Sequence, residues 1–138
     1  AIVCELDSQW QPKSGTEQRI DADVICLAVG LSPLTDILWQ AECEMVFVPE
    51  LGGNVAYRDS NMCTSKPHIY VAGDVAGVEE ASSAMVEGEL AGLCAAKSLG
   101  VSGAHLTLQI TSARSQLEEL RSGPVGDKIR AGLLQAHR

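Results

Sequence analysis

The 138-residue sequence lacks several features that would assign it to common classes of protein. It has ten lysines and arginines against eighteen aspartates and glutamates, and a net charge of −8 argues against nucleic acid or an anionic membrane as a partner. The longest largely apolar run, residues 24–34, is too short to cross a membrane and contains Gly30 and Pro33. The first residues lack the pattern of a signal peptide. Because 46% of the residues are hydrophobic and 20% are charged, we expect a globular protein, and the expected compartment is the cytoplasm.

The five cysteines include no Cys-x-x-Cys pair. Cys26 and Cys94 fall among apolar residues, so we expect both to be buried, reduced thiols. The three histidines are scattered along the chain. Local spacing therefore predicts neither a redox-active cysteine pair nor a metal site, and no catalytic residue is predicted.

A short buried strand is predicted at residues 69–72, where four apolar residues follow one another without alternation. Gly73 and Asp74 follow it, at the carboxyl edge where open α/β sheets bind ligands. A helix predicted at residues 81–99 would point its free N–H groups into the same crevice. An acid beside a helix N-terminus suits a ligand with hydroxyl and anionic groups. From spacing alone, a strand, turn and crossover helix without a ligand carries about the same weight.

The neighbouring residues favour the ligand-binding alternative. Thr64-Ser65-Lys66-Pro67 precede the strand, and Gly88 lies in the helix, fourteen residues after Asp74. This order resembles the second FAD-binding motif of the pyridine-nucleotide-disulfide oxidoreductase superfamily, flavoproteins with two dinucleotide-binding domains. The resemblance covers roughly residues 22–99, since residues 23–33 also resemble the strand that ends the nicotinamide domain. Leu31 stands where disulfide-containing relatives often carry arginine.

The resemblance implies a set of residues that contact the flavin. Asp74 would accept a hydrogen bond from a ribityl hydroxyl, and the Val75 N–H would lie near the pyrophosphate or ribityl chain. Residues 81–83 match the segment that meets the pyrimidine edge, where their N–H groups would stabilise negative charge on the reduced flavin. Ser82 or Ser83 has an equally weighted alternative role as an ordinary helix N-cap. The predicted cofactor-binding residues are Gly73, Asp74, Val75, Ala81, Ser82 and Ser83.

The predicted fold class is α/β, a partial FAD/NAD(P)-binding Rossmann-like domain with a small β-meander and a C-terminal helical tail. Residues 1–40 would end a nicotinamide-type domain, residues 41–100 would form the second half of an FAD-binding domain, and residues 101–138 would be a helical extension. The local patterns predict the following elements. They are strands at 1–6, 17–20, 24–29 (fully buried) and 42–48, a loop at 7–18, a short helix at 34–40 with Trp39 packed inward, and a turn at 51–54.

We expect helices in two regions, at residues 81–99 and in the tail at residues 101–138. Small residues four apart, Ala84, Gly88, Gly92 and Ala96, form a stripe on the helix at 81–99 that predicts close packing against a neighbour. Residues 101–110 are partly β-prone. A helix capped by Ser112 or Ser115 would end near Arg121, and Pro124 would begin another. The apolar face of that last helix would comprise Val125, Ile129, Leu133 and Ala136.

Two motifs of the superfamily are absent from this sequence. It contains neither the Gly-x-Gly-x-x-Gly that holds the ADP half of FAD nor the glycine-rich loop of the nicotinamide domain. We therefore expect the C-terminal segment of a larger flavin-dependent oxidoreductase, inactive alone. The tail most resembles amine-dehydrogenase, proline-dehydrogenase or sarcosine-oxidase alpha-type subunits.

The expected cofactor is FAD in the full-length parent, with NAD(P)H as a second candidate, and hydride transfer would occur there. FAD would bind this chain weakly or not at all. The expected partner is the missing N-terminal FAD/NAD(P) portion of the same parent or another subunit, and a homodimer through exposed edges is also expected. The alternative function is a non-catalytic α/β assembly or regulatory module whose tail helices bind a partner.

Overall fold

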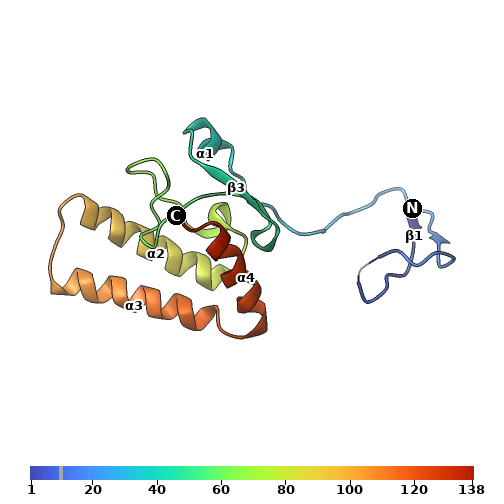
Figure 1. The fold of residues 1–138 in the computed structure, drawn as a ribbon. Coiled ribbons are helices and arrows are strands. Elements are labelled where there is room, and N and C mark those ends of the chain that lie inside the picture. Colours follow the sequence, from blue (N-terminus) through green and yellow to red (C-terminus); the bar gives the residue numbers. More distant parts are fainter. Residues whose placement is uncertain (10) are drawn as a thin grey trace. The chain divides into compact units, whose positions relative to one another are not determined.

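The computed structural model describes residues 1–9 and 11–138, and the chain divides into two units, residues 1–30 and residues 31–138 (Figure 1). Part of the loop predicted at 7–18 lies outside the described residues. None of the described helices is long and apolar enough to span a bilayer.

The first unit is a small antiparallel hairpin. Strands β1 (Ile2–Val3) and β2 (Gln18–Arg19) pair with Ile2 opposite Arg19. The carboxylate of Asp7 accepts hydrogen bonds from the backbone N–H groups of Gln9 and Gln11, at 2.8 and 2.9 Å, and so closes the tip. The predicted hairpin is therefore confirmed, with shorter strands than expected.

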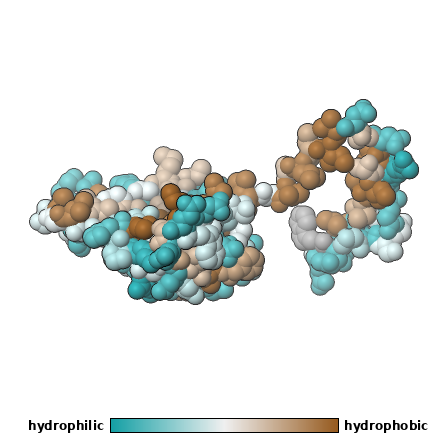
Figure 2. Space-filling view, turned by 90° about the horizontal axis from the view of Figure 1, so that it is seen from above, coloured by the Kyte–Doolittle hydropathy of each residue, from teal (hydrophilic) through white to brown (hydrophobic). Residues whose placement is uncertain are grey.

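The buried strand predicted at residues 24–29 is wrong for this chain. These residues have no regular secondary structure, and the side chains of Leu27 and Val29 are 79% and 88% exposed. Cys26 is also exposed, so its predicted burial is wrong. A strand buried on both faces needs a neighbour on each side, and no strand within the described residues pairs with this segment. Figure 2 shows apolar surface on the unit that contains it.

The second unit begins with a short helix and a hairpin. Helix α1 (Asp36–Gln40) precedes strand β3 (Met45–Val48), the 3₁₀ turn η1 (Pro49–Leu51) and strand β4 (Gly53–Ala56). The strands are antiparallel, and Gly52 takes the left-handed conformation between them, with φ of +88°. The predicted order of these elements is confirmed. Trp39 was expected to pack inward but is 52% exposed, because Leu38 takes the buried face of α1.

The segment predicted as a buried parallel strand, residues 69–72, is extended but joins no sheet. It makes one isolated antiparallel bridge, between Cys63 and Tyr70, and the Val71 N–H donates to the Met62 carbonyl at 3.0 Å. Val71 is buried. The described residues hold two two-stranded sheets and four α-helices, so the α/β class is supported at this coarse level without a parallel sheet.

Helices α2 (Ala81–Ser98) and α3 (Ala104–Leu120) pack side by side (Figure 1). Residues 104–110 are helical although residues 101–110 are partly β-prone in composition, because the apolar residues of α3 recur at helical spacing and bury one face against α2. Neither Ser112 nor Ser115 caps a helix, since both lie inside α3. The shared core comprises Met62, Leu90, Ala91, Cys94, Ile110, Ala113 and Leu117.

The stripe of small residues on α2 is open to solvent at its two glycines, whereas Ala84 at its start lies against Gly73. A Cβ atom added to Gly88 or Gly92 would meet nothing within 4 Å, so the predicted close packing is wrong at these two residues. The face of α2 that is buried carries Glu87, Leu90 and Cys94 instead, because α3 covers that side.

Helix α4 (Gly123–Gln135) packs against η1 and β3, with Pro124 in its first turn as predicted. Ile129, Leu133 and Ala136 contact the buried cluster of Val48, Leu51 and Val55. Val125, predicted on the same face, is exposed. The tail is therefore folded onto the hairpin that precedes the Gly73–Asp74 turn.

Candidate functional site

The Gly-Asp pair lies in a short 3₁₀ turn, η2 (Gly73–Ala76). Gly73 has φ of +71°, which glycine adopts without strain. The Gly77 N–H donates to the Asp74 carbonyl at 3.3 Å, and the Val78 N–H donates to the Leu51 carbonyl at 3.0 Å. The turn is therefore closed on itself and tied at its end to η1.

This turn packs against the beginning of α2. A Cβ atom placed on Gly73 would lie 3.5 Å from the Cβ of Ala84, an ordinary van der Waals distance. Residue 73 is therefore glycine because of its backbone conformation and not for lack of space. The structure thus brings the predicted Gly73–Val75 segment beside the helix that carries the other predicted residues.

Asp74 offers an ionisable acceptor at this position. Its side chain is exposed, and no donor within the described residues hydrogen-bonds its carboxylate. A carboxylate that is not already bonded within the protein can accept a hydrogen bond from a ligand hydroxyl. Val75, the next residue, is half-buried.

Helix α2 begins at Ala81 with an uncapped N-terminus. Glu80 occupies the N-cap position and makes no side-chain capping hydrogen bond. Ser82 and Ser83 lie in the first turn, so the alternative that either is the N-cap is wrong. The N–H groups of residues 81–83 have no acceptor inside the helix, as at any helix N-terminus. Ala81 and Ser82 are exposed, whereas Ser83 is buried and lines a cavity of about 480 Å³.

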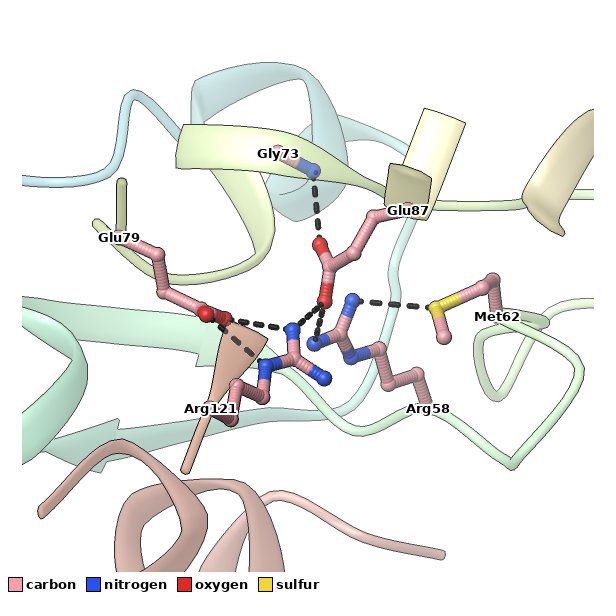
Figure 3. Close-up of polar contacts among 6 residues, drawn as sticks. All are labelled: Arg58, Met62, Gly73, Glu79, Glu87 and Arg121. Carbon is pink, nitrogen blue, oxygen red and sulfur yellow. Dashed lines mark hydrogen bonds and ion pairs between the residues drawn. The ribbon is translucent and has the colours of Figure 1, made fainter. Parts of the chain in front are cut away.

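A buried carboxylate, Glu87, holds the turn in place (Figure 3). Its Oε2 accepts a hydrogen bond from the Gly73 N–H at 2.9 Å. Its Oε1 accepts from Arg58 Nη2 at 2.6 Å and from Arg121 Nη2 at 2.5 Å. One side chain on α2 therefore connects the predicted flavin turn with the loop after β4 and with the end of α3.

Arg121 extends this cluster to a second acid. Its Nε and Nη2 donate to the two carboxylate oxygens of Glu79, at 2.9 and 2.7 Å. Such a two-pronged pair fixes both side chains in orientation. Glu79 lies in the segment between η2 and α2, so the same guanidinium contacts both sides of the candidate site. We call Arg58, Glu79, Glu87 and Arg121 the buried ion cluster.

The buried ion cluster is compensated in charge, with two acids and two arginines whose side chains are at most 10% exposed. Burial opposes ionisation of Glu87, but the charges of Arg58 and Arg121 and the hydrogen bonds outweigh it and lower the pKa of its carboxyl. Burial likewise opposes the charge of Arg121, yet the bonds to Glu79 and Glu87 raise its pKa. Glu87 and Arg121 are therefore both charged at neutral pH.

The threonine-proline segment before the turn has a local structural role. Thr64 is buried, and its Oγ1 accepts from the Lys66 N–H at 3.2 Å and donates to the Lys66 carbonyl at 3.3 Å. The Thr64 N–H donates to the Ile69 carbonyl at 2.8 Å. These hydrogen bonds close a tight loop that directly precedes the extended residues 69–72.

Sequence reasoning did not identify the buried ion cluster. Glu87 had one usable signal, an acid on the apolar stretch of α2 directly before Gly88. Arg58 and Arg121 had none, because each lies 29 or more residues from Glu87 along the chain. No cluster of potential metal ligands is present among the described residues.

Residues 3–88 match the model of a protein family described as pyridine nucleotide-disulphide oxidoreductase. The chain is 31% identical over 107 residues to hydrogen cyanide synthase subunit HcnB of Pseudomonas protegens, which covers 78% of this chain and 23% of that protein. It is 32% identical over 107 residues to an opine oxidase subunit of Rhizobium meliloti, covering 78% of this chain and 19% of that protein.

A third relative is an opine oxidase subunit of Agrobacterium tumefaciens, 38% identical over 79 residues, which are 57% of this chain and 16% of that protein. The chain thus spans less than a quarter of the length of these relatives. No solved structure matches it.

Proposed function

Since this chain belongs to the pyridine nucleotide-disulphide oxidoreductase family, we propose that it is the flavin-binding segment of a longer oxidoreductase. In this proposal the chain supplies the flavin and ribityl half of an FAD site, as the last part of a Rossmann-like domain. The relatives named as oxidase and synthase subunits support an oxidoreductase. They are four or more times longer than the segment they share with this chain, which supports a longer parent.

The observation that carries the proposal is the pairing of two free polar features. Asp74 presents an exposed carboxylate without a partner in the described residues, and α2 begins beside the same turn with N–H groups that lack an acceptor. A ribityl chain has hydroxyl donors for the first, and the pyrimidine edge of a flavin has acceptors for the second. The donor and acceptor chemistry of the site therefore fits this part of FAD.

The residues would act by binding and orientation. Asp74 would hold a ribityl hydroxyl, the Val75 N–H would contact the ribityl or pyrophosphate region, and residues 81–83 would place positive partial charge at the pyrimidine edge. When bound, FAD supplies hydride transfer at its N5 atom in exchange with a substrate or nicotinamide. The chain contributes no proposed nucleophile or general base.

The alternative of a non-catalytic binding module gains no specific support. Ile110 and Leu117 of α3 pack against α2, and Ile129 and Leu133 of α4 pack against the hairpin. Leu108, Val125 and Leu134 on the same helices remain exposed, and nothing in the structure identifies a partner for them.

The test is flavin retention by the longer protein that carries this segment, compared between wild type, Asp74→Asn and Asp36→Asn. Asp36 is an exposed acid on α1 and serves as the matched control. Asp74→Asn, which loses a charged acceptor, should weaken flavin binding by about tenfold to a hundredfold, and Asp36→Asn should leave it unchanged. Equal retention by all three proteins would refute the proposal.

A further inference from the structure

We propose that Glu87 is a positioning residue that holds the Gly73–Asp74 turn in its binding geometry, and that Arg121 couples this turn to the helical tail. The inference rests on the proposed flavin site, because it concerns the same turn. Neither residue is expected to touch the flavin itself.

The two oxygens of the Glu87 carboxylate bind different partners. Oε2 accepts the Gly73 N–H, while Oε1 accepts from Arg58 and Arg121 (Figure 3). Because one oxygen is held by two guanidinium groups, the other is fixed in direction. Rotation of the carboxylate about its Cγ–Cδ bond moves both oxygens, so a rotation that withdraws Oε2 from residue 73 also moves Oε1 away from the arginines.

The Glu87 oxygen binds the N–H of Gly73, the residue directly before Asp74, which is the acid predicted to bind the ligand. Gly73 is in the left-handed region, a conformation that a flexible loop leaves easily, and its N–H has no backbone acceptor within the described residues. The Glu87 oxygen therefore sets the backbone that leads directly to the Asp74 side chain. The Asp74 carboxylate itself makes no hydrogen bond to the part of the chain that the structure describes.

Arg121 gives the tail a direct connection to the site. It is the C-cap residue of α3, and its guanidinium bonds Glu87 behind the turn and Glu79 before α2. A displacement of the end of α3 would therefore act on the turn and on the approach to residues 81–83 together.

The experiment follows the Gly73 backbone amide by NMR in the 15N-labelled chain, through its proton shift and its rate of hydrogen exchange. Arg121→Lys keeps a positive charge but loses the planar fork that bonds both acids. We expect it to move the Gly73 proton upfield and to speed exchange about tenfold, although residue 121 does not touch residue 73. Glu87→Gln should do the same.

Two controls separate positioning from general loosening of the fold. Glu79→Gln breaks the other half of the Arg121 contact but leaves the bond from Gly73 to Glu87, so the Gly73 signal should stay in place. Glu119→Gln changes an exposed acid in the last turn of α3 and should have no effect. If Glu87→Gln does not fold, the pair Glu87→Gln with Arg121→Gln removes one acid and one base together, and keeps the cluster neutral.

Wild-type Gly73 exchange in Arg121→Lys would overturn the coupling, and wild-type exchange in the Glu87 variants would overturn the positioning role. A Gly73 signal that responds equally to Glu79→Gln and Arg121→Lys would also overturn it, since only general loosening predicts that. These outcomes do not depend on flavin. Retention of flavin by the Asp74→Asn protein would refute the proposed function separately.

Discussion

Glu87 and Gly73, fourteen residues apart, are joined by a hydrogen bond of 2.9 Å from the backbone N–H to Oε2. Gly73 begins the turn that contains the predicted ribityl-binding aspartate, and Glu87 is the most buried acid in that region, at 1% exposure. An ionised, buried carboxylate therefore holds the backbone of the candidate site in place. The stability of this turn depends on the two arginines that keep the carboxylate charged.

Replacing Glu87 with alanine should destabilise the chain by about 3–5 kcal/mol, because two buried arginines lose a shared partner and the Gly73 N–H loses its acceptor. Urea unfolding followed by circular dichroism measures the change. Glu89→Ala, an exposed acid two residues further along α2, is the control and should change stability by less than about 0.5 kcal/mol. Similar effects from both substitutions would contradict the assigned role of Glu87.

The free energy of unfolding should fall at acid pH because Glu87 becomes protonated. The pKa of its carboxyl in the folded chain lies below the ordinary value of 4.5, so the folded state favours the ionised form. This contribution is fully present above about pH 4.5 and is lost as the pH falls through the lower, folded pKa. Urea midpoints measured from pH 7 down to pH 3 should therefore decline, and the decline should be shallower in Glu87→Gln. Parallel pH profiles for the two proteins would show that another carboxyl is responsible.

Gly88→Ala should stabilise the isolated chain by about 0.5–1 kcal/mol, because alanine favours the helix and its methyl group would meet nothing within 4 Å. In the longer protein of our proposal the gain should vanish if the glycine stripe packs closely there. Gly73→Ala is the opposite control, since φ of +71° should cost about 1–2 kcal/mol. Thermal or urea unfolding measures whether Gly88→Ala raises and Gly73→Ala lowers the free energy of unfolding. Destabilisation of the isolated chain by Gly88→Ala would show that the space around residue 88 is not open.

The exposed apolar segment at residues 24–29 should make the isolated chain associate, as a dimer or larger assembly. Leu27→Lys should weaken that association, measured by light scattering over a range of concentrations. Leu99→Lys is the matched control, because Leu99 is 78% exposed and Leu27 is 79% exposed, and Leu99 lies outside the segment. A wild-type chain that stays monomeric at high concentration would contradict the expectation.

The sequence was sufficient for features that depend on local chemistry. The helix at residues 81–98, the turn around Gly52 and the last helix with Pro124 in its first turn each had a local signal, and each is present. The family was also identifiable, because Thr64, Pro67, Gly73, Asp74 and Gly88 keep a specific spacing.

Features that depend on distant partners were not predictable. Residues 24–29 and 69–72 have the composition of buried parallel strands, but a strand forms only where neighbours supply hydrogen bonds. Residues 104–110 are helical despite a β-prone composition, because packing of Ile110 on α2 outweighs local preference. The buried ion cluster joins residues from four separate segments, and no local pattern marks such a contact.

The most direct test of the central claim is an NMR titration of the 15N-labelled chain with FMN and, separately, with ADP at millimolar concentration. FMN contains the isoalloxazine and ribityl groups of FAD, and ADP corresponds to the other half. We predict that FMN shifts the backbone amides of residues 73–75 and 81–83 and that Asp74→Asn reduces these shifts. ADP, whose pyrophosphate could reach only the Val75 N–H, should leave the amides of Asp74 and residues 81–83 unchanged. Shifts with ADP at these residues, or shifts with FMN confined to other parts of the chain, would contradict the flavin assignment.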